Sequence, residues 1–473
     1  MSATSVVTAA ARPLRLPLRV QDAALGAGPL LVGVIVTLPV VLLLANTFNV
    51  APPGREATYG LDNWVRAFSD AGTLSALWNS VALGFVRTAI SLPIAIAVAW
   101  LIARSDMPGR SVVELLCWLG IFLPQLPLVF GWILLLDPQY GLVNQGLMRL
   151  LGLESGLFNI YGFLGITWVH LANTSIYYKV VLLLPAFRFV GAHLEEAARM
   201  SGASPFTTIM RITIPLLTPA VLGVTVLAFV RSLEVFEIEL LLGRPVNLAV
   251  YSTRIYDLVR DQPPRFGEAT ALGFVFLVVM LGLAVLYQWA LRGKSFTTIT
   301  GRGYTPTPVQ LGRWRWVASG ACFAWFAIAM AAPLTFLVLG SFMRRYGFFQ
   351  IVNPFTLNHW QNLFNDPVFF SSVRNSLILA TAVALSGALI YSLVAYAIVR
   401  HPSRWTRLTD VLVWVPWAVP GILMSLGLLW LFLGTPLRVI LYGSLLGIIV
   451  AIVIKDSPLT TQFFKAACLQ IGA

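Results

Sequence analysis

The short motifs that most often carry chemistry are incomplete in this sequence. Gly293-Lys294-Ser295 matches the end of a phosphate-binding loop, but such a loop needs a further glycine at the position of Gln288. The histidines and cysteines are scattered, without metal-ligand or disulfide spacing: His170, His193, His359, His401, Cys117, Cys322 and Cys468. We therefore expect no cofactor, no metal site, no nucleophile–base set and no enzymatic activity in this chain.

Charged residues inside an apolar run give a second candidate site. The stretch FVRSLEVFEIELLLG (229–243) contains Arg231, Glu234, Glu237 and Glu239. Charges in a membrane segment are costly and usually face the interior of a helix bundle or a water-filled cavity. Arg231 and Glu234 are three residues apart and can pair on one helix face, and Glu234 and Glu237 can share a counter-ion there. Arg231, Glu234 and Glu237 are thus candidates for a translocation path, although solvated positions at the outer end of a span would explain them equally well.

The third candidate is the polar stretch LEEAARMSGAS (194–204). Its first part consists of good helix formers, and Ser201-Gly202 is a plausible helix stop. Ser204-Pro205 is typical of an N-cap followed by proline at the first helical position, and we expect the second short helix to end at Pro215. The pattern predicts a helix–turn–helix near the membrane surface, and an ordinary amphipathic surface loop is the alternative.

The elements that position these residues are apolar. The chain has 473 residues, of which 58% are hydrophobic and only 11% charged, and its mean hydropathy is +0.82. Runs of about 20 apolar residues are long enough to cross a bilayer as helices. They predict an all-α polytopic membrane protein with ten spans, at roughly 27–48, 80–103, 112–136, 161–186, 217–242, 270–292, 317–342, 375–399, 409–434 and 440–464.

Basic residues predict the orientation of these spans. The net charge of +13 reflects Lys and Arg in cytoplasmic loops, and we expect no nucleic-acid partner. Arg12, Arg15 and Arg19 precede the first span, so the N-terminus is predicted in the cytoplasm. The connector 292–316 carries five Lys or Arg and no acidic residue, which agrees with that assignment.

An internal repeat is the main global feature of the sequence. LDNWVRAF (61–68) matches LNHWQNLF (357–364), and the shift between the two tryptophans is 360 − 64 = 296. The same shift relates Asn79-Ser80 to Asn375-Ser376, Pro124 to Pro420 and Gly131 to Gly427. After a shorter loop the shift becomes 442 − 161 = 281, at YGFL and YGSL. Since a cytoplasmic segment precedes each half, the repeats are predicted to be parallel. Proline pairs interrupt the third and ninth spans, and the repeat of Pro124 at Pro420 favours a packing role over a gate.

The polar loop also resembles a known family. EAARMSG (196–202), followed nine residues later by ITIP (212–215), is similar to the EAA loop in the membrane subunits of bacterial binding-protein-dependent ABC importers. Ile214 stands where that family usually has leucine. The resemblance implies a loop that docks on an ATPase through Glu195, Glu196, Ala197, Ala198, Gly202, Ile212 and Pro215. The duplicated form resembles the ferric-iron importer branch, so ferric iron is the expected substrate, with thiamine, polyamine and phosphonate as alternatives.

The resemblance implies partners and a domain plan. The partners would be a cytoplasmic ABC ATPase, expected as a homodimer, and a periplasmic substrate-binding protein, in a bacterial inner membrane. We expect a tail at 1–26, a first MetI-like transmembrane domain at 27–292 with the loop at 193–215, a basic linker at 293–316 and a second transmembrane domain at 317–473. The repeat places a second loop beyond Ala473, so the second domain is expected to lack that loop and its last two helices. An ion-gradient-driven secondary transporter, or an inactive truncated permease, is the alternative function.

Overall fold

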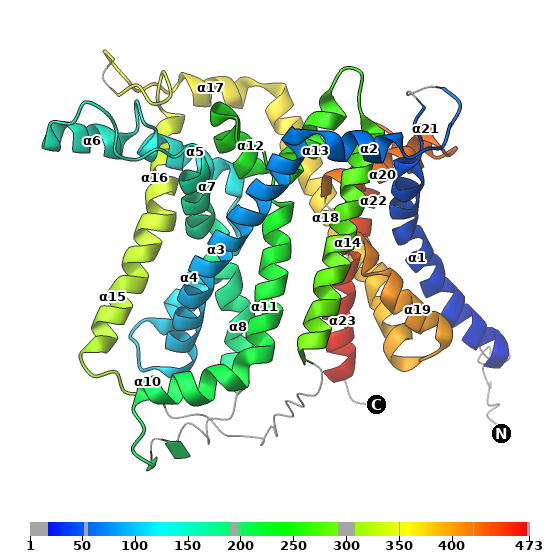
Figure 1. The fold of residues 1–473 in the computed structure, drawn as a ribbon, viewed down its shortest axis with the longest axis horizontal. Helices are drawn as coiled ribbons and strands as arrows, with labels where there is room; N and C mark the ends of the chain where they lie inside the picture. The colour runs from blue at the N-terminus through cyan, green and yellow to red at the C-terminus, as the bar shows by residue number, and fades with distance from the viewer. Residues whose placement is uncertain are drawn as a thin grey trace, which may run out of the picture. The chain divides into compact units, whose positions relative to one another are not determined.

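The structure is a computed structural model that describes residues 18–51, 55–189, 197–198, 200–291, 308–349, 351–419 and 421–470. Within these ranges the regular structure is helical, with three isolated β-bridges and no strand (Figure 1). The predicted all-α class is therefore confirmed.

Helices lie at all ten predicted spans. Five stretches are long and apolar enough to cross a membrane: Ala27–Thr47 within α1 (Leu18–Thr47), α3 (Ala71–Arg104), Ile209–Glu234 comprising η2 (Ile209–Thr213) and α11 (Ile214–Glu234), Trp314–Ser341 comprising α15 (Trp314–Phe326), η4 (Ala327–Ala331) and α16 (Ala332–Ser341), and α18 (Pro367–Arg400). Three further spans are bent pairs: α4 (Arg110–Phe122) with α5 (Gln125–Leu136), Arg404–Trp417 with α20 (Gly421–Leu433), and α22 (Leu445–Lys455) with α23 (Ser457–Gln470). The remaining two are the continuous run α7 (Phe163–His170), η1 (Leu171–Ser175) and α8 (Ile176–Phe189), and α14 (Phe266–Leu291).

Short helices join the spans. They are α2 (Asp62–Ser69), α6 (Leu142–Leu151), α10 (Pro205–Thr208), η3 (Arg244–Val246), α13 (Tyr251–Arg260), α17 (Asn358–Asn365) and α21 (Arg438–Leu441). Three other short helices lie within predicted spans: α12 (Glu237–Gly243) follows α11 in the fifth, and α19 (Arg404–Leu412) and η5 (Val415–Ala418) form the first part of the ninth. In unit 2, defined below, α10 lies at the same end as the start of α4, and α2, α6, α12 and α13 lie at the opposite end (Figure 1).

The third span is broken, as its prolines predict. Leu123 is extended, with φ −66° and ψ 134°, and the helix axis turns by 101° between α4 and α5. A residue before proline is driven out of the α region, which explains why α4 ends ahead of Pro124. The ninth span bends by 113° at the repeat-related place, between Trp417 and Gly421.

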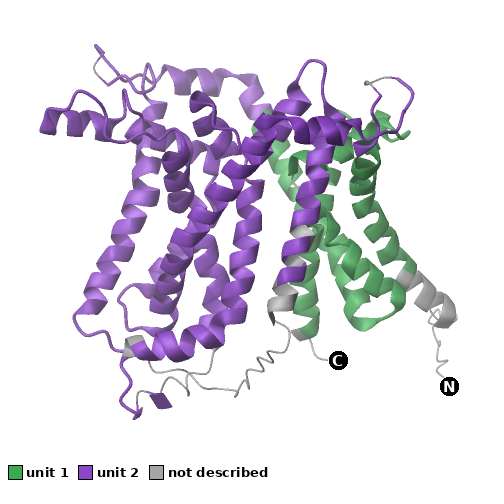
Figure 2. Ribbon diagram, in the orientation of Figure 1, with its two compact units in different colours: residues 1–46, 372–473 green, residues 47–371 purple. Residues whose placement is uncertain are grey.

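Contacts divide the chain into two units that do not follow the order of the repeats. Unit 1 comprises residues 1–46 and 372–473, and unit 2 comprises residues 47–371 (Figure 2). Unit 1 thus contains α1 together with most of the second repeat, whereas α15 and α16 belong to unit 2 with the first repeat. The predicted domain plan had instead kept each of these spans with its own half of the sequence.

In each unit an equivalent glycine contacts the helix that comes from the other half of the sequence, which is α16 in unit 2 and α1 in unit 1. A Cβ on Gly131 of α5 would overlap the carbonyl oxygen of Pro333 in α16. In unit 1, a Cβ on Gly427 of α20 would overlap the carbonyl oxygen of Pro39 in α1. Glycine therefore permits the close helix approach that membrane bundles use. The repeat also recurs in the backbone, since α3 and α18 each have 34 residues and start 367 − 71 = 296 positions apart.

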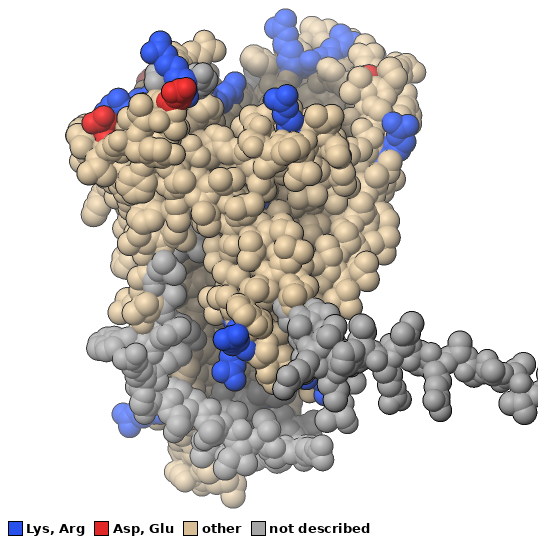
Figure 3. Space-filling model, turned by 90° about the vertical axis from the view of Figure 1, so that its right-hand side faces the viewer, with Lys and Arg blue, Asp and Glu red and all other residues tan. Residues whose placement is uncertain are grey.

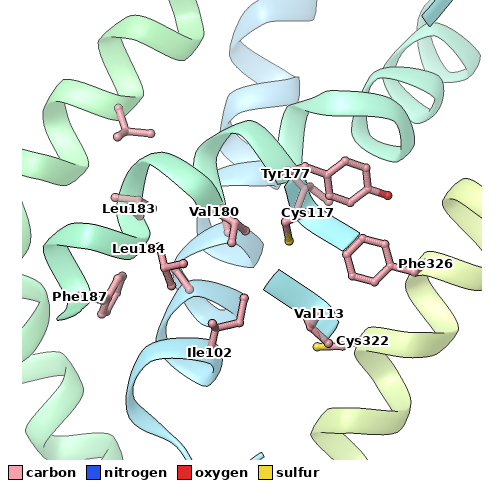
Figure 4. Packing of buried hydrophobic residues seen from close by; sticks show 14 of the residues in the cluster. Ile102, Val113, Cys117, Tyr177, Val180, Leu183, Leu184, Phe187, Cys322 and Phe326 are labelled. Carbon is pink, nitrogen blue, oxygen red and sulfur yellow. The ribbon is translucent and has the colours of Figure 1, made fainter. Parts of the chain in front are cut away.

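One buried hydrophobic cluster of unit 2 lies among α3, α4, α8, α11 and α15. Figure 4 shows Cys117 of α4, Tyr177 of α8 and Phe326 of α15 in one cluster of buried side chains. The Tyr177 and Phe326 rings stack with their centroids 5.2 Å apart. A buried aromatic ring contributes more to stability than an exposed one. Because α15 supplies Phe326, this helix is an integral part of the cluster.

Charged side chains are unevenly distributed on the surface. On the face drawn in Figure 3, Lys and Arg gather toward the two ends, and a broad band between them carries mainly uncharged side chains. Such a band is expected of a surface that faces lipid.

Candidate coupling loop and translocation path

The described part of the polar loop confirms a helix stop at Gly202. Glu195 and Glu196 lie outside the described residues, whereas Ala197 and Ala198 are helical. The Ala203 N–H donates to the Ala198 carbonyl at 3.0 Å, which is the terminal bond of a helix closed by a left-handed residue. Gly202 supplies that residue with φ +83°, and no described atom lies within 4 Å of a Cβ placed on it. Glycine is needed here for its backbone conformation and not for space.

The second helix of the loop begins as predicted but does not end as predicted. Pro205 is the first residue of α10, and the Ser204 hydroxyl accepts a hydrogen bond from the Thr207 N–H at 3.2 Å. The helix then passes through the π-turn η2 into α11, so the expected end at Pro215 is wrong. The Ile214 N–H donates to the Ile209 carbonyl, five residues back. This wider turn lets the helix continue at a proline that has no N–H to donate.

The loop residues present a small, accessible surface. Ala197, Gly202 and Pro215 are exposed, and Ile212 is half-buried. Met200 is 89% exposed, a high value for an apolar side chain at a helix end. Among the loop residues that the structure describes, the exposed ones thus have small or apolar side chains, apart from the hydroxyls of Ser201 and Ser204 and the charge of Arg211.

Ion pairs dominate the opposite end of unit 2. Arg254 of α13 pairs with Asp70 at 2.5 Å, Arg244 pairs with Asp257 at 2.5 Å, and Arg265 pairs with Glu268. Burial raises the pKa of Asp70, but hydrogen bonds from Thr73 and Gly72 and the charge of Arg254 together hold it below its usual value. The hydrogen bonds and charge of Glu268 likewise raise the pKa of Arg265. This end is a network of paired charges.

The path candidates do not share one helix. Arg231 and Glu234 pair in the last turn of α11 at 3.5 Å, as their spacing predicts, with 43% and 19% of their side chains exposed. Glu237 begins the separate helix α12, because Val235 is extended with ψ 141°. The expectation that Glu234 and Glu237 share a counter-ion on one helix face is therefore wrong. Glu237 is exposed, whereas Glu239 is buried.

A buried polar cluster was not predicted. Arg87 of α3 donates from Nη1 to Oε1 of Glu239 at 3.1 Å, and His170 Nε2 lies 2.9 Å from the same oxygen. The three side chains are 1–4% exposed. The second carboxylate oxygen, Oε2, has no hydrogen-bond partner among the residues that the structure describes. A lone arginine in the middle of an apolar run was the signal in the sequence, since charges within spans rarely lack a role.

Comparisons with known proteins identify relatives of this architecture. No family model matches the chain. The putative ferric transport system permease protein FbpB 1 of Haemophilus influenzae is 26% identical over 390 residues, covering 81% of this chain and 59% of the relative. The ferric transport system permease protein FbpB of Actinobacillus pleuropneumoniae is 25% identical over 411 residues, covering 85% and 58%. The chain is a homologue of ABC transporter permeases.

Shorter permeases and solved structures are similar to parts of the chain. The molybdenum transport system permease protein ModB of Escherichia coli K12 is 28% identical over 229 residues, covering 46% of this chain and 93% of the relative. A bacterial alginate ABC transporter, solved with a periplasmic protein carrying alginate pentasaccharide, is 26% identical over 49% of this chain and 83% of that chain, with a TM-score of 0.44. The chain spans less than three fifths of the length of the two ferric permeases. Its similarity to permeases, together with its apolar helices, makes it a multi-pass inner-membrane protein.

Proposed function

We propose that this chain forms the translocation path of a binding-protein-dependent ABC importer, with ferric iron as its substrate. The similarity to two ferric transport permeases over more than four fifths of the chain carries the proposal for the substrate class. Molybdenum permeases among the relatives make an oxyanion the competing substrate.

ATP hydrolysis would reside on a partner chain, a cytoplasmic ABC ATPase that acts as a homodimer. The loop 193–215 is its docking element, and the closed helix end at Gly202 followed by the capped start at Ser204 supports that role. A small exposed turn at Gly202, ahead of the helix that begins at Pro205, fits a cleft on a soluble protein, because alanine and glycine let a partner backbone approach closely.

The opposite end of unit 2 would receive a periplasmic binding protein. The paired charges of α13 and its neighbours support this, since such networks give specificity and orientation at interfaces. The proposed location of the N-terminus is cytoplasmic, because arginines precede the first span. Arg231 and Glu234 would line the path between the two ends.

Uptake of radiolabelled ferric iron and of molybdate by cells depleted of their own importers tests the proposal. We expect iron uptake that depends on the chain, on an ABC ATPase that co-purifies with it, and on ATP. Uptake driven by a proton or sodium gradient without an ATPase would refute the importer mechanism, and uptake of molybdate alone would refute the substrate.

A further inference from the structure

The Arg87 guanidinium spans the break in the fifth span. Its Nη2 donates to the Ser232 carbonyl at 2.6 Å, in the last turn of α11, and its Nη1 donates to Glu239 in the first turn of α12. The last four carbonyls of a helix have no partner within the helix. Arg87 thus satisfies one of these carbonyls and simultaneously holds the helix that follows the break. His170 fixes the same carboxylate from α7.

The helix turn held in this way carries the exposed charged pair. Ser232 lies between Arg231 and Glu234, whose side chains are part-exposed and pair with each other. The cluster therefore bonds to the same helix turn that carries this pair. Between this turn and α12 the backbone passes through Val235, which is extended, and Phe236, with φ −134° and ψ −46°. The Val235 carbonyl accepts a hydrogen bond from the Ser252 hydroxyl of α13, and the Arg87 bonds join the two helices across this break.

Two positions of the cluster, those of Arg87 and His170, are apolar in the second repeat. At the shift of 296 the residue that corresponds to Arg87 is Val383, since 87 + 296 = 383. The residue that corresponds to His170 is Ala451 or Ile452, at a shift of 281 or 282, and both are apolar. The helix-packing glycines Gly131 and Gly427, by contrast, occur in both repeats. A buried charge cluster in a span is costly, so charged side chains of the first repeat that apolar ones replace in the second call for a local function.

We propose that Arg87, His170 and Glu239 form a positioning site that fixes the break in the fifth span and thereby orients the Arg231–Glu234 pair in the translocation path. The inference rests on the proposed function only where it assigns the Arg231–Glu234 pair to a translocation path. The geometry of the break is a property of the folded chain. Arg87, His170 and Glu239 are positioning residues, because they act through α11 and α12 and lie away from the exposed surface.

Replacement of the whole cluster separates positioning from packing. In R87M the Glu239 charge stays buried without its main partner, so the thermal unfolding midpoint should fall strongly. In the triple variant R87M/H170L/E239M no buried charge remains, and apolar side chains of similar volume should recover most of that loss. R254M/D70M is the matched control, because it removes an ion pair of unit 2 that does not touch the break.

Spin labels measure the break directly, independently of transport. Labels at the exposed positions Met210 and Glu237, introduced as M210C and E237C after replacement of the native cysteines, report the distance from the start of the fifth span to α12. We expect the triple variant to be folded but to show a broadened distance distribution with its maximum shifted by several ångström, whereas the control keeps the parent distribution. A parent-like distribution in the folded triple variant would overturn the proposal. If iron uptake fails in the parent but the distances change as expected, the proposed function fails and the positioning site stands.

Discussion

Replacement of Gly202 by valine should uncouple the permease from its ATPase without unfolding it. Gly202 has φ +83°, in the left-handed region, and the Ala203–Ala198 hydrogen bond depends on that conformation. A residue with a Cβ loses about 1–2 kcal/mol in this region, and β-branched valine lies at the upper end. Since no described atom lies within 4 Å of the new Cβ, the cost is purely conformational.

This cost predicts the size of the effect. A loss of about 1–2 kcal/mol lowers the ratio of closed to open loop by a factor of about 5–30, and the affinity for an ATPase that binds only the closed conformation falls by up to the same factor. Asparagine tolerates the left-handed region, so G202N should lose only about twofold in affinity.

Gly152 provides a matched control. It also ends a helix in the left-handed conformation, with φ +66° and no described atom within 4 Å of its Cβ, but at the end of α6. G152V thus carries the same conformational cost at the opposite end of unit 2. Affinity is measured by titrating the purified, detergent-solubilised permease with the ABC ATPase that co-purifies with it, and folding is measured by thermal unfolding. Equal loss of ATPase affinity in G202V and G152V, or wild-type affinity in G202V, would refute the docking assignment.

Three further predictions concern packing, pH and capping. G131A should destabilise unit 2 by about 1–3 kcal/mol, because its Cβ overlaps the Pro333 carbonyl oxygen. G146A, with no described atom within 4 Å of its Cβ, should be neutral or stabilising. Thermal unfolding distinguishes the two variants, and equal unfolding midpoints would contradict the helix contact. The pKa of Asp70 is lowered, so its ion pair should stabilise the fold at neutral pH and be lost as the pH falls below the ordinary value of 3.8 and through the lowered pKa, and D70N should remove this part of the acid sensitivity in pH-dependent unfolding. S204A removes the cap of α10 and should cost about 1 kcal/mol, seen as faster amide exchange in residues 206–208, and unchanged exchange would show that the cap is not needed.

Local signals in the sequence predicted much of the loop and of the span pattern. Gly202 and Ser204-Pro205 were read correctly, because helix ends depend on one or two residues with specific backbone or side-chain properties. The continuation through Pro215 was missed, since proline is a strong stop in an α-helix and a π-turn that tolerates it has no clear sequence signature. The break at Pro124 was visible in the sequence, but its angle of 101° was not.

Contacts between distant segments could not be predicted in the same way. The shared glycines at 131 and 427 indicated a packing constraint, yet nothing in their surroundings identified Pro333 and Pro39 as the partners. The Arg87–Glu239 pair joins residues 152 positions apart, so no helical or strand period links them. Periodicity predicts elements and their faces, while the pairing of faces is decided by the assembled bundle.

The exchange of first helices also constrains the order in which the protein can mature. The ribosome completes the first repeat's own spans long before it makes α15 and α16, which unit 2 requires for its core. Until then, the helix surface around Gly131 must remain in the bilayer without its packing partner α16. Likewise α1, the first described helix, lacks its contact with Gly427 until α20 has been synthesised. Severing the polypeptide in the linker at 293–316 would therefore yield two fragments that each lack a piece held by the other, and neither could finish folding before they meet.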